Sequence, residues 1–255
     1  MRPGTRRALI TGAGSGLTAG IAAAVAGDGF ERITFTYRSG DPQATSDAIR
    51  LAGASAYALT LDVEGDARAV DAAFAALVRE EGPFDTLIHG VGELTVKRFA
   101  NLDIDDYTRA FDVNVRSAVL AARAVLPQMR ASSFGRIVFF GGYGAGETRP
   151  FRGFALHQAA KSALVAFARS LAIEEAEHGI TVNVVEPGDI REKDITRKDA
   201  ATRKSVIPRG RPGSYEDLAD VVRFLIAAER DFVTGAVIAV TGGLTQADGR
   251  NADRA

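Results

Sequence analysis

His157 and Lys161 lie four residues apart in the segment FALHQAAKSAL, and this pair is the first feature of the sequence that is suited to chemistry. The apolar spacing of the segment is that of a helix, and residues four apart on a helix share one face. Imidazole transfers protons readily, because its ordinary pKa is about 6.5. A neighbouring ammonium lowers that pKa, since two cations repel each other. The spacing therefore predicts a proton-transfer group, His157, that is mostly neutral at neutral pH.

A glycine-rich turn near the N-terminus is the second such feature. The segment ALITGAGSGLT, residues 8–18, follows a strand-like run directly and opens a helix-like run. Glycines let the backbone approach a pyrophosphate, and the N-terminus of a helix favours its negative charge. The pattern predicts a dinucleotide site whose phosphate-binding loop contains Gly12, Gly14, Ser15, Gly16 and Leu17.

The second strand-like run ends in TYRSG, which bears on the choice of dinucleotide. A site for NAD usually places a carboxylate here, to accept hydrogen bonds from the ribose 2′-hydroxyl. Tyr37 takes that place, and Arg38 and Ser39 follow it. A guanidinium attracts a 2′-phosphate and binds it through two hydrogen bonds. We therefore expect NADP(H), with its 2′-phosphate at Arg38 and Ser39.

Short apolar runs alternate with longer amphipathic runs along the chain, which predicts a parallel sheet with helices on both faces. The expected strands are 7–11, 32–37, 56–63, 84–90, 135–142, 180–188 and 235–243. The expected helices are 17–29, 42–53, 64–82, 104–130, 154–179 and 214–229. Right-handed crossovers then give one α/β, doubly wound, Rossmann-type domain with seven strands over residues 1–245. Residues 246–255 read as a polar C-terminal tail.

Composition limits the other functional classes. The chain has 255 residues, a formal net charge of −1 and no cysteine. Near-neutral charge gives no general attraction to nucleic acid, and no apolar run is long enough to span a membrane. The three histidines, His89, His157 and His178, do not have metal-ligand spacing. We expect a cytoplasmic protein that binds a small-molecule substrate and no metal.

Several ordered motifs together resemble the short-chain dehydrogenase/reductase family, most closely its 3-oxoacyl-carrier-protein reductase and glucose dehydrogenase group. They are the loop glycines after Thr11, the pair Asp62-Val63, the segment FDVNV with Asn114, and the segment EPGDI with Pro187, Gly188 and Ile190. The resemblance implies that Asp62 and Val63 lie near the adenine and that Gly90, Lys161, Pro187, Gly188 and Ile190 line the cofactor site. It also implies catalytic roles for Asn114 and Lys161, and a homotetramer.

The sequence departs from the family pattern at half of the catalytic tetrad. His157 stands where the family has tyrosine, and Gly142, followed by Tyr143, stands where it has serine. Four interpretations stay open: His157 transfers the proton, Tyr143 supplies a phenol instead, the substrate is an imine that brings its own proton, or the protein binds dinucleotide without turnover. The first makes it an oxidoreductase for a carbonyl/alcohol pair, and the last a sensor or partner subunit.

Residues 191–211 correspond to the substrate lid of the family. The segment has more basic than acidic residues; the basic ones are Arg191, Lys193, Arg197, Lys198, Arg203, Lys204, Arg209 and Arg211. A positive lid attracts anions, which suggests a carboxylate, a phosphate or a carrier-bound thioester as substrate. A solvated helix face is the competing interpretation.

Overall fold

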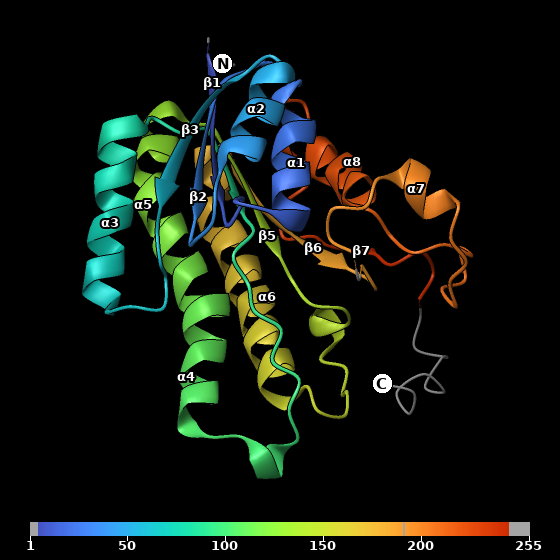
Figure 1. Cartoon of the computed structure of the whole chain (residues 1–255). Helices are drawn as coiled ribbons and strands as arrows, with labels where there is room; N and C mark the ends of the chain where they lie inside the picture. Colours follow the sequence, from blue (N-terminus) through green and yellow to red (C-terminus); the bar gives the residue numbers. More distant parts are fainter. Residues whose placement is uncertain (1–4, 191, 245–255) are drawn as a thin grey trace.

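Seven parallel strands form one sheet in the computed structural model, which describes residues 5–190 and 192–244 (Figure 1). The strand order is β3-β2-β1-β4-β5-β6-β7. The strands are β1 (Arg6–Thr11), β2 (Phe30–Tyr37), β3 (Ser55–Thr60), β4 (Thr86–His89), β5 (Gly135–Phe140), β6 (Ile180–Pro187) and β7 (Val237–Val240). The predicted seven-stranded, doubly wound architecture is confirmed. The predicted polar tail and Arg191 lie outside the described residues.

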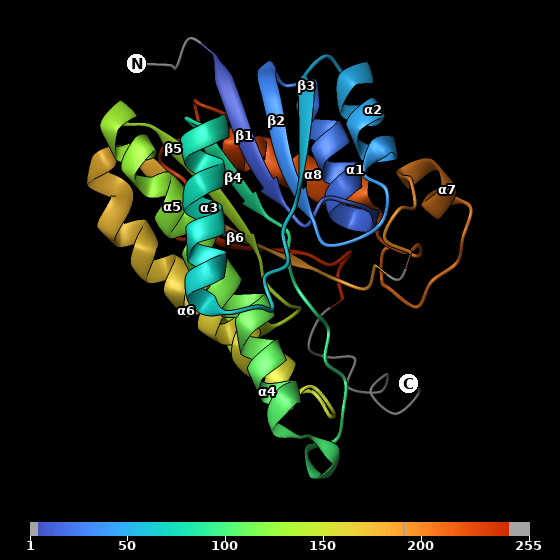
Figure 2. The same cartoon turned by 60° about the vertical axis from the view of Figure 1, so that its left-hand side comes forward.

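Helices cover both faces of this sheet, as Figures 1 and 2 show from two directions. One face packs against α1 (Gly16–Ala26), α2 (Gln43–Leu51) and α8 (Tyr215–Ile226), and the other against α3 (Ala67–Glu81), α5 (Ser117–Ser132) and α6 (Ala155–Glu175). Each face has its own apolar core, built around Ile33 and Phe35 on the first and around Leu87 and Phe139 on the second. Within the described part of the chain, no helix has both the length and the apolar composition to cross a bilayer.

The helix predicted over 104–130 is divided in the structure. It consists of α4 (Ile104–Phe111), a π-helical segment (Asp112–Arg116) and α5. A π-helical turn contains one more residue than an α-helical turn and often occurs at functional sites. The side-chain nitrogen of Asn114, in the middle of this segment, donates a hydrogen bond to the carbonyl oxygen of Ala110 (2.9 Å). The wider turn therefore holds the Asn114 side chain toward the interior. Apolar periodicity alone does not predict this irregularity of the helix.

One short helix and one capping box complete the architecture near the lid. Helix α7 (Arg197–Ala201) lies inside the segment predicted as the lid, for which a solvated helix face was the competing interpretation. At the start of α8, the side chain of Ser214 accepts from the backbone of Asp217, and the Asp217 carboxylate accepts from the backbone of Ser214. Reciprocal bonds of this kind fix the beginning of a helix.

The order of the strands places a crevice next to β1. Chain connections run from β1 toward β3 in one direction and from β4 toward β7 in the other, so the direction reverses between β1 and β4. Ligands of open α/β sheets bind at this reversal, outside the carboxyl ends of the strands. The loops that follow β1 and β4 are the glycine-rich turn and the segment HGVG.

Replacing Phe74 by alanine is expected to lower the free energy of unfolding by about 3–5 kcal/mol, because the ring is fully buried between α3 and the sheet. Phe232 is 99% exposed, so Phe232→Ala is the matched control and is expected to leave the stability nearly unchanged. Urea denaturation followed by circular dichroism measures both. Equal losses in the two variants would contradict this packing.

Candidate active site

Two adjoining cavities of about 510 and 520 Å³ occupy the crevice. They share a wall made by Gly12, Ser15, Gly90, Gly92 and Glu93. The first also contains Gly14, Arg38, Ser39, Asp62 and Val63, and the second contains Leu17, Tyr143, His157, Lys161, Pro187, Gly188 and Ile190. The structure thus brings together nearly all the residues predicted from the sequence, around a continuous elongated space.

The glycines of the loops form a backbone-lined floor for this space. A Cβ on Gly14 would lie 2.6 Å from Cβ of Tyr37, and Gly12 has a φ of +71°, which side chains disfavour. A Cβ on Gly90 would lie 2.4 Å from two side-chain atoms of Thr18. Gly16 lines neither cavity; its Cβ position is 3.3 Å from Lys193. The floor lets a flat, extended ligand contact the backbone directly, and these residues fit a dinucleotide.

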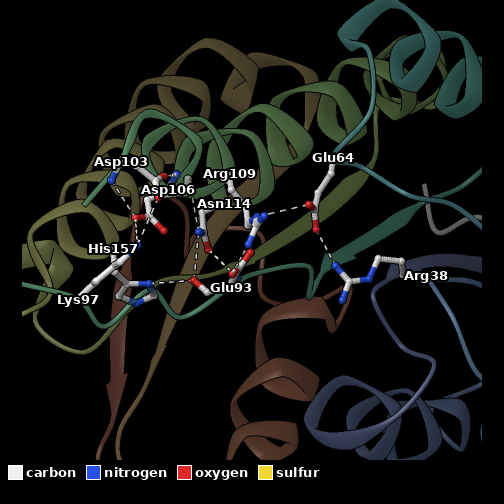
Figure 3. Close-up of polar contacts among 10 residues, drawn as sticks. Arg38, Glu64, Glu93, Lys97, Asp103, Asp106, Arg109, Asn114 and His157 are labelled. Atoms are coloured by element: carbon white, nitrogen blue, oxygen red, sulfur yellow. Dashed lines mark hydrogen bonds and ion pairs between the residues drawn. The ribbon is translucent and has the colours of Figure 1, made fainter. Parts of the chain in front are cut away.

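The guanidinium of Arg38 lines the first cavity and also pairs with an acidic side chain. One of its terminal nitrogens lies 2.6 Å from the carboxylate of Glu64, and the second oxygen of that carboxylate lies 3.5 Å from Nε of Arg109. A further nitrogen of Arg109 lies 4.0 Å from the carboxylate of Glu93 (Figure 3). The guanidinium expected to bind a phosphate therefore already has a carboxylate partner.

Lys161 lies next to Gly92 in the wall of the second cavity. Its Nζ donates a hydrogen bond to the carbonyl oxygen of Phe140 (2.9 Å), at the end of β5. A Cβ on Gly92 would lie 3.0 Å from Nζ, so a side chain there would require the ammonium to move by a few tenths of an ångström. Burial lowers the pKa of Lys161 to about 8, and most of the side chains are still charged at neutral pH.

The imidazole of His157 is fixed in one tautomer. Its Nδ1 lies 3.0 Å from the carbonyl oxygen of Glu93, and since a carbonyl only accepts, Nδ1 carries the hydrogen. The other nitrogen, Nε2, is then a bare acceptor, and no group within residues 5–190 or 192–244 donates a hydrogen bond to it. Burial, and secondly the charge of Lys161, lower the pKa of His157 to about 4. His157 is therefore neutral at pH 7, with its lone pair in the second cavity.

Asn114 acts on His157 through Glu93. Its side-chain oxygen accepts from the backbone nitrogen of Glu93 (3.1 Å), and its side-chain nitrogen donates to the Glu93 carbonyl (3.2 Å), the same oxygen that binds His157 (Figure 3). Asn114 is completely buried and lines neither cavity. Asn114 was predicted as a catalytic residue. In the structure its side chain holds the backbone of Glu93, whose carbonyl oxygen orients the imidazole of His157.

Gly142 and Tyr143 lie on the opposite side of His157. A Cβ on Gly142 would lie 3.2 Å from Nε2 of His157 and 3.2 Å from Cγ of Lys161, so the absence of a side chain there makes room for the imidazole. The Tyr143 ring stacks with Phe151 at 5.5 Å, and its hydroxyl accepts from Arg149 (3.2 Å). Tyr143 thus lines the same cavity as His157, with its hydroxyl bound to an arginine.

His89 lines neither cavity, although it is the last residue of β4. Ser117 donates its hydroxyl hydrogen to the carbonyl of Val113 (2.6 Å), so its oxygen accepts from Nε2 of His89 (3.0 Å). Nδ1 of His89 then accepts from the hydroxyl of Thr11 (2.8 Å). Complete burial, and secondly Lys161, lower the pKa of His89 to about 3. His89 is a neutral core histidine with both nitrogens satisfied.

The lid is less positive than its sequence suggests. Arg197 pairs with Asp217 (3.1 Å) and Asp220 (2.5 Å), Arg211 pairs with Asp217 (2.7 Å), and Arg203 pairs with Glu192. Although burial acts to raise it, hydrogen bonds from Arg211 and Ser214 hold the pKa of Asp217 well below its usual range. Lys193 is the one lid lysine in the wall of the second cavity. Acids on α8 and within the lid thus pair with three of the lid arginines, which reduces the positive charge expected there.

Three functional residues stand out in the structure more than in the sequence. Glu93 orients His157 through its backbone carbonyl, which no sequence motif marks. Glu64 and Arg109 belong to no motif either, and both line the first cavity and pair with each other. The only signal for Glu64 was its position directly after Asp62-Val63.

His157 and His89 are expected to be neutral, with the ring hydrogen on different nitrogens. Nitrogen-15 chemical shifts of the two rings, followed from pH 7.5 to pH 4, are expected to show the hydrogen on Nδ1 of His157 and on Nε2 of His89. His157 is expected to take up a proton only near pH 4. A His157 that titrates near pH 6.5 would contradict the geometry described above.

Comparisons with known proteins identify the family of the chain. The family model described as enoyl-(acyl carrier protein) reductase matches residues 12–245. The 3-oxoacyl-acyl-carrier-protein reductase FabG of Escherichia coli K12 is 32% identical over 241 residues, which cover 93% of this chain and 96% of that protein. The inactive 2-(S)-hydroxypropyl-CoM dehydrogenase 2 of Xanthobacter autotrophicus is 36% identical over 202 residues, which cover 76% and 86%. The crystal structure of acetoin dehydrogenase from Enterobacter cloacae superimposes with a TM-score of 0.86 at 26% identity, over 98% and 99% of the two chains. The chain belongs to the short-chain dehydrogenase/reductase family of oxidoreductases.

Proposed function

We propose that the protein is an NADP(H)-dependent oxidoreductase that interconverts an alcohol and a carbonyl compound, with His157 in place of the usual tyrosine. The observation that carries this proposal is the fixed tautomer of His157. Its Nδ1 is bound to the carbonyl of Glu93, and its Nε2 is left as an acceptor in a cavity that adjoins the dinucleotide crevice. A positioned acceptor of this kind is suited to general base catalysis.

The cofactor would lie along the two cavities. The first would hold its adenosine half near Asp62, Val63 and Arg38, and the second its nicotinamide half near Pro187, Gly188 and Ile190. When bound, the nicotinamide accepts or donates the hydride. Lys161, held by Phe140 at the boundary of the second cavity, supplies a positive charge that stabilises a developing oxyanion and hydrogen-bonds a ribose hydroxyl.

The protonation state of His157 favours alcohol oxidation. The hydroxyl of a bound alcohol donates its hydrogen bond to Nε2, and Nε2 takes the proton as the carbon–oxygen double bond forms. The carbonyl of Glu93 stabilises the resulting imidazolium, because Nδ1–H already points at its oxygen. Reduction of a ketone would require the protonated ring, which a pKa of about 4 makes scarce at neutral pH. An imine that arrives protonated would not need this acid.

The second cavity favours a substrate with an apolar body. Rings of Tyr143, Phe151, Phe154 and His157 follow one another at centroid distances of 5.5, 6.0 and 6.2 Å. Lys193 adds one cationic side chain to the same wall, where it suits a substrate with an anionic end. We therefore propose a small apolar or aromatic alcohol, with a carboxylate or phosphate as an optional second feature.

A non-catalytic NADP-binding protein is the second candidate. Gly142 supplies no hydroxyl, and Asn114 uses its amide on Glu93 and Ala110. In addition, one relative that shares 36% of its residues carries the name of an inactive dehydrogenase. Cofactor binding is common to both candidates, and turnover separates them.

The homotetramer stays a prediction, which the exposed Ile104 and Tyr107 on α4 and Ile173 on α6 favour.

Replacing His157 by phenylalanine is expected to lower turnover by roughly 10²–10⁴-fold, because both the Nε2 acceptor and the Nδ1–H bond to Glu93 are lost. The affinity for NADPH is expected to stay unchanged, because an aromatic ring still fills the same place. Turnover is measured in both directions with a panel of secondary alcohols, ketones, imines and acyl thioesters. His178→Phe, at the protein surface, is the matched control and is expected to behave as the wild type. Full turnover in His157→Phe would overturn the proposed role. NADPH binding without any turnover in the wild type would favour the second candidate.

The pH dependence of alcohol oxidation provides an independent test. The neutral imidazole is the active form, so kcat/KM is expected to be flat from pH 7 to pH 5 and to fall about tenfold per pH unit below about 4. Tyr143→Phe is expected to keep this acidic limb. A limb that disappears in Tyr143→Phe, or a rate that rises as the pH drops from 7 to 5, would contradict His157 as the base.

A further inference from the structure

We propose that Glu64, positioned by Arg109, limits the preference of this site for NADP(H) over NAD(H) by opposing the 2′-phosphate at Arg38. This inference rests on the proposed use of NADP(H). It concerns a residue that lies outside the glycine-rich loop and outside the catalytic group. It also concerns binding alone and does not depend on turnover.

The geometry places a carboxylate where the phosphate is expected. Arg38, at the end of β2, and Glu64, after β3, line the same cavity, and their charged atoms lie 2.6 Å apart. The Arg38 side chain is 66% exposed and has no other ion pair among the described residues. Glu64 is half-buried, with 32% of its side chain exposed. The Arg38 guanidinium thus pairs with the Glu64 carboxylate and would also be the partner of an incoming 2′-phosphate.

Glu64 opposes the phosphate in either of two ways. If the phosphate displaces Glu64, the ion pair with Arg38 is lost. If the guanidinium binds both anions through different nitrogens, the carboxylate remains within a few ångströms of a doubly charged group and repels it. The ribose of NAD(H) carries a neutral hydroxyl at this point, so neither penalty applies to it. The carboxylate can also accept a hydrogen bond from that hydroxyl, as acidic residues do in NAD sites.

Arg109 keeps Glu64 in this place. Its Nε lies 3.5 Å from the carboxylate oxygen that does not bind Arg38, so it holds the carboxylate from the opposite side (Figure 3). Its other end lies 4.0 Å from the Glu93 carboxylate. When Arg38 turns to a phosphate, Glu64 retains Arg109 as a partner and does not need to leave the cavity. Its negative charge therefore stays close to the ligand.

The test measures dissociation constants of NADPH and NADH by fluorescence titration of the whole protein, without substrate. In Glu64→Gln the ratio of the NADH constant to the NADPH constant is expected to rise roughly two- to fivefold above the wild type, an estimate based on exposed ion pairs. Glu80→Gln removes an ion-paired surface carboxylate on α3, outside the cavity, and is the matched control with no expected change. An unchanged ratio in Glu64→Gln would overturn the inference and leave the proposed function intact.

A double-mutant cycle identifies the partner through which Glu64 acts. Arg38→Gln is expected to lower the ratio, and Glu64→Gln is expected to raise it far less in the Arg38→Gln background than alone. An equal rise in both backgrounds would overturn the role of Arg38 as the shared partner. Arg109→Gln is expected to change the ratio in the protein that retains Glu64 and to change it much less in the Glu64→Gln background. This dependence on Glu64 is what identifies Arg109 as a positioning residue. Failure of the wild type to bind either dinucleotide would instead overturn the proposed function.

Discussion

The hydrogen bond from Nδ1 of His157 to the carbonyl of Glu93 is the interaction on which the rest of the site depends. It decides which nitrogen of the ring carries the hydrogen, and so whether the cavity presents a donor or an acceptor. The carbonyl is itself immobilised, because Asn114 binds both the nitrogen and the oxygen of the same residue. The π-helical segment between α4 and α5 holds Asn114 in this position. A backbone irregularity on one helix thus sets the chemistry of a side chain on another.

Electrostatics links this part of the site to its far end. The charges alternate in sign along Arg38, Glu64, Arg109 and Glu93, from the adenosine side of the crevice to the residue that orients His157 (Figure 3). At the other end, the buried ammonium of Lys161 keeps both neighbouring imidazoles neutral, with burial as the larger cause. The positive and negative side chains of this series therefore balance each other, as they nearly do in the whole chain, whose formal net charge is −1.

The sequence was most informative where local patterns decide the structure. The alternation of strands and helices and the glycine-rich turn correctly predicted the sheet and most of the cavity walls, because both depend on short-range spacing. It was least informative where contacts join distant segments. Nothing in the sequence pairs Arg38 with Glu64, and the acids of α8 that neutralise Arg197 and Arg211 lie outside the lid. The tautomer of His157 depends on a main-chain oxygen, which has no sequence signature at all.

The contact between Gly142 and His157 has a consequence for any attempt to rebuild the site. A side chain at residue 142 would have its first carbon 3.2 Å from Nε2 of His157 and 3.2 Å from Cγ of Lys161. A serine hydroxyl can therefore be added at residue 142 only if the imidazole or the Lys161 side chain moves by a few tenths of an ångström. Residues 142 and 157 consequently have to be varied together, because a change at one alters the space of the other.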